Sequence, residues 1–466
     1  LHHKGEYDQA LEHFQKALAI CCKQLGEDHP DVAISYNNIG EVHREKGEFD
    51  LVLEYFQGAL AIELEHLGPN HPEVALRYCQ IGMLYRDLGE YDHALEFLTK
   101  NLAIDLELYG PDHLNLVNSY TIIGLIYRGK EEYDKAIEYY QKSLDIESVQ
   151  LGLDHPDVAN SYNIICETYR EKGEHDKALG FAQKAMAIHL KELGPNHLDM
   201  ATSYNNIGAI YRVLGEYDQA LEYYQRAVAI MSEHLGPDDL DIAILLSNIG
   251  RIYSETDRYD QALENYQKSL VIRLNQLGSD HPEVAKIYDR IGGTHYLNDE
   301  YDKALDYYQE ALSIWLVQLG PEHLDVAATY DSIGSVYDNK GEYDHALEYH
   351  QKSLAILFKQ LGANHPDVAA SYNVIGMVHD NKGASDRALE YYQKSLNIRL
   401  EQLGPDHPDV AINYNNIGLV HSDKDEHDQA LEYFQKALDI FFEQLGADHP
   451  YTTQTLKNVS LLKEQL

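Results

Sequence analysis

The sequence predicts an all-α protein, a right-handed superhelical solenoid of antiparallel helix pairs. One pattern recurs every 42 residues along the 466-residue chain, and no insertion or deletion interrupts the spacing. In one copy, Gly215 to Gly236, apolar residues recur at the helical spacing i, i+4 and i+7, as in Ala220, Tyr224 and Ala227. A unit of this kind buries its apolar face only against neighbouring copies, so we expect a stacked repeat array.

The array is expected to divide into three parts. Residues 1–30 form a partial repeat, in which Leu1 to Lys4 align with the end of a first helix and a second helix spans about Glu6 to Leu25. Ten complete repeats of 42 residues follow over residues 31–450. Because the chain starts at Leu1 in the middle of a repeat, we expect further sequence upstream.

Each complete repeat is predicted to contain two helices, helix A and helix B. Helix A starts at a Pro-Asp-Val corner, as in Pro30 to Lys46, and a glycine such as Gly47 ends it. Proline at the first helical position loses no hydrogen bond, and the following acid lies near the positive helix N-terminus. Helix B then runs from Glu48 to about His66. A glycine closes every copy, from Gly26 through Gly236 to Gly446, which predicts a left-handed C-cap.

A histidine precedes helix A in almost every repeat, where it can either bind a metal ion or make a hydrogen bond. These residues are His29, His71, His113, His155, His197, His281, His323, His365, His407 and His449. Neighbouring loops in such a stack lie roughly 10 Å apart, too far for a shared metal ion with ligands at about 2 Å. The pattern therefore favours a hydrogen-bonding role at the start of the helix, which Asp239 can fill in the repeat that lacks the histidine.

Residues 451–466 begin another helix A and then abandon the pattern. Val459, Leu462 and Leu466 can pack on the last repeat, while Lys457 and Lys463 face water. A terminal repeat needs such a one-sided helix, so we expect a capping helix here and a C-terminus close to the natural one.

The residues at fixed positions resemble those of a known repeat family. Tyr204, Ile207, Gly208, Tyr211, Ala220, Tyr224 and Ala227 are similar to the signature of the tetratricopeptide repeat. The 42-residue length and the Leu-Gly-Pro-Asn-His-Pro type of corner resemble the repeat domain of kinesin light chain and its relatives. The resemblance implies the fold, but such arrays serve in many contexts.

Two of these signature positions are expected to serve packing. Gly208 and its counterparts let helices A and B approach closely, and Cys166 takes the place once as a small substitute. Tyrosines at the position of Tyr204 recur along the chain and are expected to fill the space between helices. A ladder of rings that binds ligands is the alternative.

Composition and motifs exclude several classes of function. Asp and Glu number 77 against 37 Lys and Arg, giving a net charge of −40, which argues against nucleic acid or a membrane as partner. No phosphate loop, metal-ligand spacing or nucleophile motif is present, so we expect no enzyme, no cofactor and no small-molecule substrate. The four cysteines have neither metal-ligand nor redox spacing and predict reduced thiols in a cytoplasmic protein.

The candidate binding residues lie on helix A, which the resemblance places on the inner face of the array. One column, directly after the Tyr211 position, reads Arg44, Arg86, Arg128, Arg170 and Arg212, followed by Ser254, Tyr296, Asp338, Asp380 and Ser422. Two adjacent columns supply amides, among them Asn37, Asn38, Asn163, Asn205 and Asn206. An amide can pair with an extended peptide backbone, and Arg selects carboxylates. In relatives of kinesin light chain such residues bind short acidic cargo peptides.

These columns predict a non-enzymatic scaffold or adaptor that binds peptide segments of partner proteins, with acidic linear motifs in the first five repeats. In the later repeats Asp338 and Asp380 make the arginine column acidic, so two groove halves of opposite sign are expected, with a boundary near Ser254. Three alternatives remain open: each Arg pairs only with local acids; the array is the docking half of a larger protein with an enzymatic or signalling domain upstream; or it mediates homotypic assembly.

Overall fold

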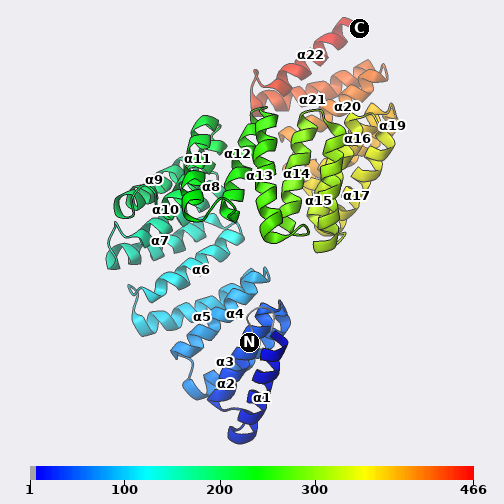
Figure 1. The fold of residues 1–466 in the computed structure, drawn as a ribbon. Coiled ribbons are helices and arrows are strands. Elements are labelled where there is room, and N and C mark those ends of the chain that lie inside the picture. The colour runs from blue at the N-terminus through cyan, green and yellow to red at the C-terminus, as the bar shows by residue number, and fades with distance from the viewer. Residues whose placement is uncertain (1–6, 466) are drawn as a thin grey trace. The chain divides into compact units, whose positions relative to one another are not determined.

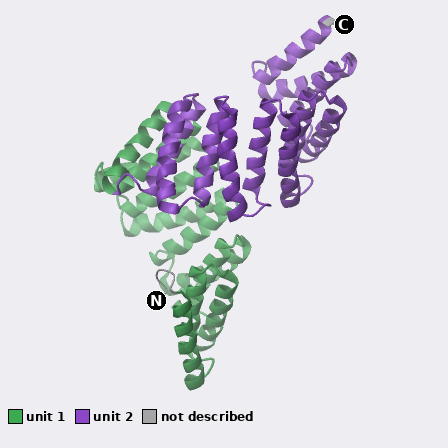
Figure 2. Cartoon of the chain, turned by 45° about the vertical axis from the view of Figure 1, so that its right-hand side comes forward, with its two compact units in different colours: residues 1–234 green, residues 235–466 purple. Residues whose placement is uncertain are grey.

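The computed structural model describes residues 7–465. The chain separates into two compact units, Leu1–His234 and Leu235–Leu466, called unit 1 and unit 2 below (Figure 2). The boundary lies between Arg212 and Ser254, so unit 1 contains every arginine of the predicted column. The expected helix end at Leu1 to Lys4 and the packing of Leu466 lie outside the described residues.

Unit 1 consists of paired helices in its described part (Figure 1). These are α1 (Tyr7–Leu25), α2 (Pro30–Glu45), α3 (Phe49–Leu67), α4 (Pro72–Asp87), α5 (Tyr91–Tyr109), α6 (Asn115–Gly129), α7 (Tyr133–Gln150), α8 (Pro156–Glu171), α9 (His175–Glu192), α10 (Leu198–Val213) and α11 (Tyr217–His234). Even-numbered helices are the predicted helices A, and the odd-numbered helices are the helices B. Their bounds agree with the predicted ones to within one or two residues.

Unit 2 continues the same alternation from α12 to the terminal helix. Its helices are α12 (Leu240–Glu255), α13 (Tyr259–Leu277), α14 (Pro282–Leu297), α15 (Tyr301–Gln318), α16 (Leu324–Asn339), α17 (Tyr343–Leu361), α18 (Pro366–Asn381), α19 (Ser385–Leu403), α20 (Pro408–Asp423), α21 (His427–Leu445) and α22 (Pro450–Gln465). No strand occurs among residues 7–465, so the predicted all-helical solenoid is confirmed.

The corner histidines cap helix A. His29 Nδ1 accepts a hydrogen bond of 3.2 Å from the backbone N–H of Asp31, which would otherwise lack a partner at the helix N-terminus. Where aspartate replaces histidine, Asp239 Oδ1 accepts the same bond from Asp241 at 2.9 Å. The predicted hydrogen-bonding role is therefore confirmed, and it accounts for the substitution.

Two glycine positions differ in conformation. Gly47, between helices A and B, has a φ of 73°, and Asp257 adopts 57° at the equivalent place, so this turn is left-handed. Gly68, after helix B, combines a φ of 81° with a ψ of 165°. A left-handed C-cap needs ψ near +47°, so that prediction is wrong for Gly68. The extended ψ carries the chain away from the helix into the loop instead of back over its end.

Helices A and B of each repeat meet at the recurring small position. A Cβ added at Gly124 would lie 2.5 Å from Tyr140 Cε1, inside van der Waals contact. Tyr140 is 2% exposed and belongs to the core. Where Cys166 replaces the glycine, the facing residue is Ala182, which is small and fully buried. The contact therefore pairs glycine with a larger residue, except in the repeat where Cys166 meets the small side chain of Ala182.

Aromatic rings fill the space between the helices of a repeat. Tyr36 lies 5.8 Å from Tyr55, and Tyr85 stacks on Phe97 at 5.6 Å between ring centroids. In the terminal helix α22, Val459 and Leu462 are buried against Ala430 and Phe434 of α21. None of the helices within residues 7–465 is long and apolar enough to cross a lipid bilayer.

Candidate functional site

The predicted arginine column lies in the last turn of consecutive helices A. Arg44, Arg86, Arg128, Arg170 and Arg212 lie on α2, α4, α6, α8 and α10. Neighbouring helices A contact each other directly, as α4 does α6 and α8 does α10. The side chains on these helices therefore form a shared surface within a unit, called the helix-A face below.

Arg128 joins two repeats through a carboxylate clamp. Its Nε and Nη2 donate to the two carboxylate oxygens of Glu171 at 2.7 and 2.6 Å, and Nη1 donates to Glu167 at 3.1 Å. Hydrogen bonding to Glu171 raises the pKa of Arg128, and its side chain is only 21% exposed. A bidentate, charge-assisted pair of this kind holds α6 against α8.

The other arginines are held less tightly. Arg44 pairs with Glu41 at 2.7 Å and Arg86 with its neighbour Asp87 at 2.7 Å, and these exposed pairs contribute little stability. Arg212 also has an interaction partner. Arg170, which is half-buried on α8, makes no ion pair within the described part of the chain. Arg44, Arg86 and Arg128 therefore pair with local acids, as the alternative interpretation expects. The guanidinium of Arg170 makes no such pair among the described residues and is available to a ligand.

The predicted amides are more deeply placed than the arginines. Asn163 is 5% exposed and Asn206 is 6% exposed. Both amide atoms of Asn163, Oδ1 of Asn205 and Nδ2 of Asn206 are buried without a hydrogen-bond partner in the described residues. Such unpaired groups cost free energy, so the amides of α8 and α10 lie beneath the helix-A face with unused hydrogen-bonding capacity.

The structure brings two predicted residues together at the start of unit 1. Asn38 and Arg44 line one hollow of about 290 Å³, together with Glu41, Val42 and Glu45 of the same helix and Phe14 of α1. Asn37 is engaged differently, because its Oδ1 accepts a hydrogen bond from Arg77 on α4. An extended segment in this hollow would meet Asn38 and Arg44 but not Asn37.

Sequence reasoning missed the buried ion pair that holds Asn37. Arg77, 4% exposed, donates from Nη2 and Nε to the carboxylate of Glu63 on α3 at 2.8 and 3.2 Å. It also donates to Gln80 at 2.7 Å. At the helix-B position of Glu63, other repeats bury His189, Arg273 or Arg399. Arg77 falls in a column that elsewhere holds mainly serine or threonine, and that difference is the only available signal.

Helices α14, α16 and α18 of unit 2 carry carboxylates at positions where unit 1 carries amides or arginines, although Asn373 and Asn415 keep an amide. Asp289 on α14 and Asp331 on α16 occupy the column of Asn37 and Asn205. Burial raises the pKa of Asp289 to about 6, and the charge of Asp325 adds to the effect. Burial likewise raises the pKa of Asp380, with a further contribution from Asp423. Comparing the column of Asn37 across all repeats would have revealed Asp289 and Asp331 from the sequence.

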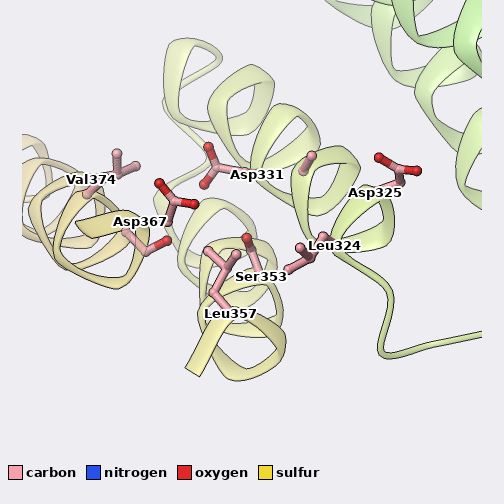
Figure 3. A pocket seen from close by; sticks show the side chains of 10 residues that line it. Leu324, Asp325, Asp331, Ser353, Leu357, Asp367 and Val374 are labelled. Atoms are coloured by element: carbon pink, nitrogen blue, oxygen red, sulfur yellow. The ribbon is translucent and has the colours of Figure 1, made fainter. Parts of the chain in front are cut away.

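A pocket of about 380 Å³ opens on this acidic face (Figure 3). It is lined by α16, α17 and α18 through Leu324, Asp325, Ala328, Asp331, Ser353, Leu357, Asp367, Ala370, Ser371 and Val374. The side chains of Asp331 and Asp367 point toward one another, whereas that of Asp325 points away from both (Figure 3). The site therefore combines aliphatic walls with two converging carboxylates.

Stacked antiparallel helix pairs with a variable face on one side define a helical-repeat protein. The sequence matches the family model for the tetratricopeptide repeat along nearly its whole length, in stretches over residues 1–65, 53–107, 73–148, 157–233, 199–275, 241–314, 283–359, 340–401, 367–443 and 409–466. The chain belongs to the tetratricopeptide repeat family. No curated protein matches the sequence.

Several solved structures are similar to this chain. BtubC (BKLC) from P. vanneervenii is 20% identical, with a TM-score of 0.42 over 50% of this chain and 92% of that one. A kinesin light chain-like protein of Podosopora anserina with nearly identical TPR-like repeats is 19% identical, with a TM-score of 0.39 over 44% of this chain and 97% of that one. The MamA protein is 25% identical, with a TM-score of 0.32 over 44% and 93%.

Proposed function

We propose that this chain is a non-enzymatic, cytoplasmic scaffold whose helix-A face binds peptide segments of partner proteins, with acidic motifs on unit 1. Arrays of this family are typical of protein–protein interaction scaffolds. The arrangement of charge on the helix-A face is the observation that carries the proposal. The same position holds arginine in five consecutive repeats of unit 1, although the protein carries a net charge of −40. The four free cysteines support a reducing compartment.

Arg170 is the residue on which recognition of a carboxylate depends most. Arg128 is committed to Glu171 and Glu167, so a ligand would have to break a bidentate pair to reach it. Arg170 has no ion pair to lose in the described part of the chain, so a ligand carboxylate gains the full charge-assisted hydrogen bond. Arg44 and Arg86 hold exposed partners that a ligand can displace at low cost.

Arg170→Gln is expected to weaken binding of a labelled, extended, glutamate-rich peptide by about tenfold or more, the equivalent of one lost charge-assisted hydrogen bond. Fluorescence anisotropy at low salt measures the change, because salt screens such contacts. Glutamine keeps most of the side-chain length, so the effect reports charge and hydrogen bonding rather than packing.

Arg226→Gln is the matched control. Arg226 is an exposed arginine of helix B in the same unit, paired with Glu222 one helical turn away. It should leave the affinity unchanged. If the Arg170→Gln variant binds the peptide as tightly as the wild type, the assignment of Arg170 is contradicted. If Arg170→Gln and Arg226→Gln lose the same affinity, the loss comes from the change in net charge and not from a contact with Arg170.

A further inference from the structure

The pocket between α16, α17 and α18 exists because α16 and α18 each carry an alanine where most repeats carry a larger side chain. Ala328 and Ala370 line it at equivalent positions of successive repeats. At that position the other complete repeats carry Ile34, Leu76, Asn118, Asn160, Thr202, Ile244, Lys286 and Ile412. Every one of these is larger than alanine, and the equivalent hollow one repeat earlier, where Lys286 takes the place of Ala328, measures only about 160 Å³.

The carboxylates at the mouth of the pocket are oriented and keep free acceptor capacity. Asp331 Oδ1 lies 2.7 Å from Nδ1 of His350, which is 1% exposed. Because a carboxylate only accepts, the imidazole Nδ1 must carry the proton, and the bond fixes the aspartate side chain. Asp331 Oδ2 has no hydrogen bond among the described residues, so it remains available to a ligand.

Asp367, on the opposite side of the mouth, also has no neighbouring side chain among the described residues that neutralises its carboxylate. His365 lies nearby, with its Nδ1 3.7 Å from the Asp367 carboxylate. That nitrogen already accepts the backbone N–H of Asp367 at 3.2 Å. Its lone pair is therefore in use, and it holds no proton with which to neutralise the carboxylate. No basic side chain lines the pocket within residues 7–465.

Two hydroxyl groups inside the pocket lack partners. Ser353 is 1% exposed and Ser371 is 6% exposed, and neither makes a hydrogen bond among the described residues. The Ser353 hydroxyl points from α17 into the space beneath Asp331 and Asp367 (Figure 3). Because the Ser353 oxygen opens into the acidic pocket and has no partner among the described residues, it can accept a hydrogen bond from a donor that enters from outside.

We propose that this pocket binds a lysine or arginine side chain from an extended segment of a partner protein. The aliphatic stem of such a residue lies against Leu357, Val374 and the two alanines, and its cationic end lies between Asp331 and Asp367. The N–H groups of the cation donate to the carboxylates and to the Ser353 hydroxyl. A neutral or acidic side chain leaves two carboxylates facing each other without compensation.

The inference deepens the proposed function and rests on it, since it gives the helix-A face of unit 2 a ligand class opposite to that of unit 1. The probe is a labelled, extended peptide with one central lysine, compared with the same peptide carrying norleucine there. Norleucine preserves the aliphatic stem and removes the charge. The full chain should bind the lysine peptide about tenfold or more tightly than the norleucine peptide.

Two sets of variants locate the binding. Asp331→Asn with Asp367→Asn should abolish the preference for lysine, and Asp306→Asn, an exposed aspartate of helix B without a partner in the described residues, should preserve it. Ala328→Ile with Ala370→Leu fills the pocket with residues that other repeats already hold there. The filled variant should fold, shown by an unchanged circular dichroism spectrum, and lose binding of the lysine peptide.

Three results would overturn the inference: equal affinity for the lysine and norleucine peptides, full lysine preference in the filled variant, or loss of preference in the Asp306 control. Binding of the glutamate-rich peptide to unit 1 is measured in parallel. If the glutamate-rich peptide still binds when one of these results is obtained, the proposed function stands and only the assignment of the pocket to a basic side chain is contradicted. Failure of both peptides to bind would contradict the proposed function itself.

Discussion

Arg77→Met is expected to lower the free energy of unfolding by about 3–5 kcal/mol, the cost of leaving a buried charge without its partner. Glu63 is 8% exposed, and its carboxylate receives two hydrogen bonds from Arg77. Methionine fills much of the same volume against Phe56, whose ring lies 5.4 Å from the guanidinium carbon. Urea denaturation followed by circular dichroism measures the loss.

The double variant Arg77→Met, Glu63→Leu separates charge burial from packing. With both charges removed, most of the stability should return, because a buried ion pair contributes little net free energy relative to apolar residues of similar size. A single variant that loses less than about 1 kcal/mol would mean that Glu63 reaches water or takes up a proton at little cost. A double variant as unstable as the single one would mean that packing, rather than the unpaired carboxylate, sets the cost.

Gly124→Cys is expected to destabilise the protein by about 1–3 kcal/mol, the usual cost of overpacking a core. The new Cβ would lie 2.5 Å from the ring of Tyr140, which is buried and has little room to move. The same substitution is already present at Cys166, where the facing residue is Ala182. There the contact is comfortable, and burial raises the pKa of the Cys166 thiol to about 12.

Combining Gly124→Cys with Tyr140→Ala reproduces the arrangement of Cys166 and Ala182. The double variant should lose less free energy of unfolding than the two single variants lose together. The difference, measured by urea denaturation, is expected to be about 1–3 kcal/mol. Additivity within about 0.5 kcal/mol would contradict the account of this position as a steric pair. Gly180→Ala on α9, where an added Cβ meets no atom within 4 Å, is the control and should cost little.

The frame of the protein follows from its sequence because each structural requirement recurs at a fixed position. The 42-residue period, the Pro-Asp start of helix A and the small position at Gly124 each have one physical cause repeated along the chain. Asp239, which replaces a corner histidine, makes the same capping bond and shows why the position tolerates either residue. Only the conformation after helix B was predicted wrongly, because a glycine reveals a positive φ but not the value of ψ.

The interior and the candidate site were harder to predict because their residues vary between repeats. Arg77 and Glu63 are charged, and charged residues are ordinarily assigned to the surface. Their burial depends on two side chains that meet across neighbouring helices, a contact that no single column shows. The arginine column was found from its regularity, but the clamp between Arg128 and Glu171 is visible only in the structure.

The pocket in unit 2 illustrates the same limit. Ala328 and Ala370 are unremarkable as residues of a helix, and only the packing of α16, α17 and α18 turns them into a hollow. Asp331 acquires its orientation from His350, which occupies a core position held by Tyr308 and Tyr392 in adjacent repeats. Specificity in this array therefore lies in exceptions to the repeat, and the repeated residues supply the scaffold.

Competition between the two peptide probes tests most directly whether the two units bind ligands of opposite charge. The glutamate-rich peptide is labelled and bound to the full chain, and the unlabelled lysine peptide is added in excess while anisotropy is followed, together with the reverse experiment. Independent sites predict that each peptide binds and that neither displaces the other. Displacement of one peptide by the other at the concentration set by its own affinity would show a single shared site and contradict the assignment of acidic segments to unit 1 and basic segments to unit 2.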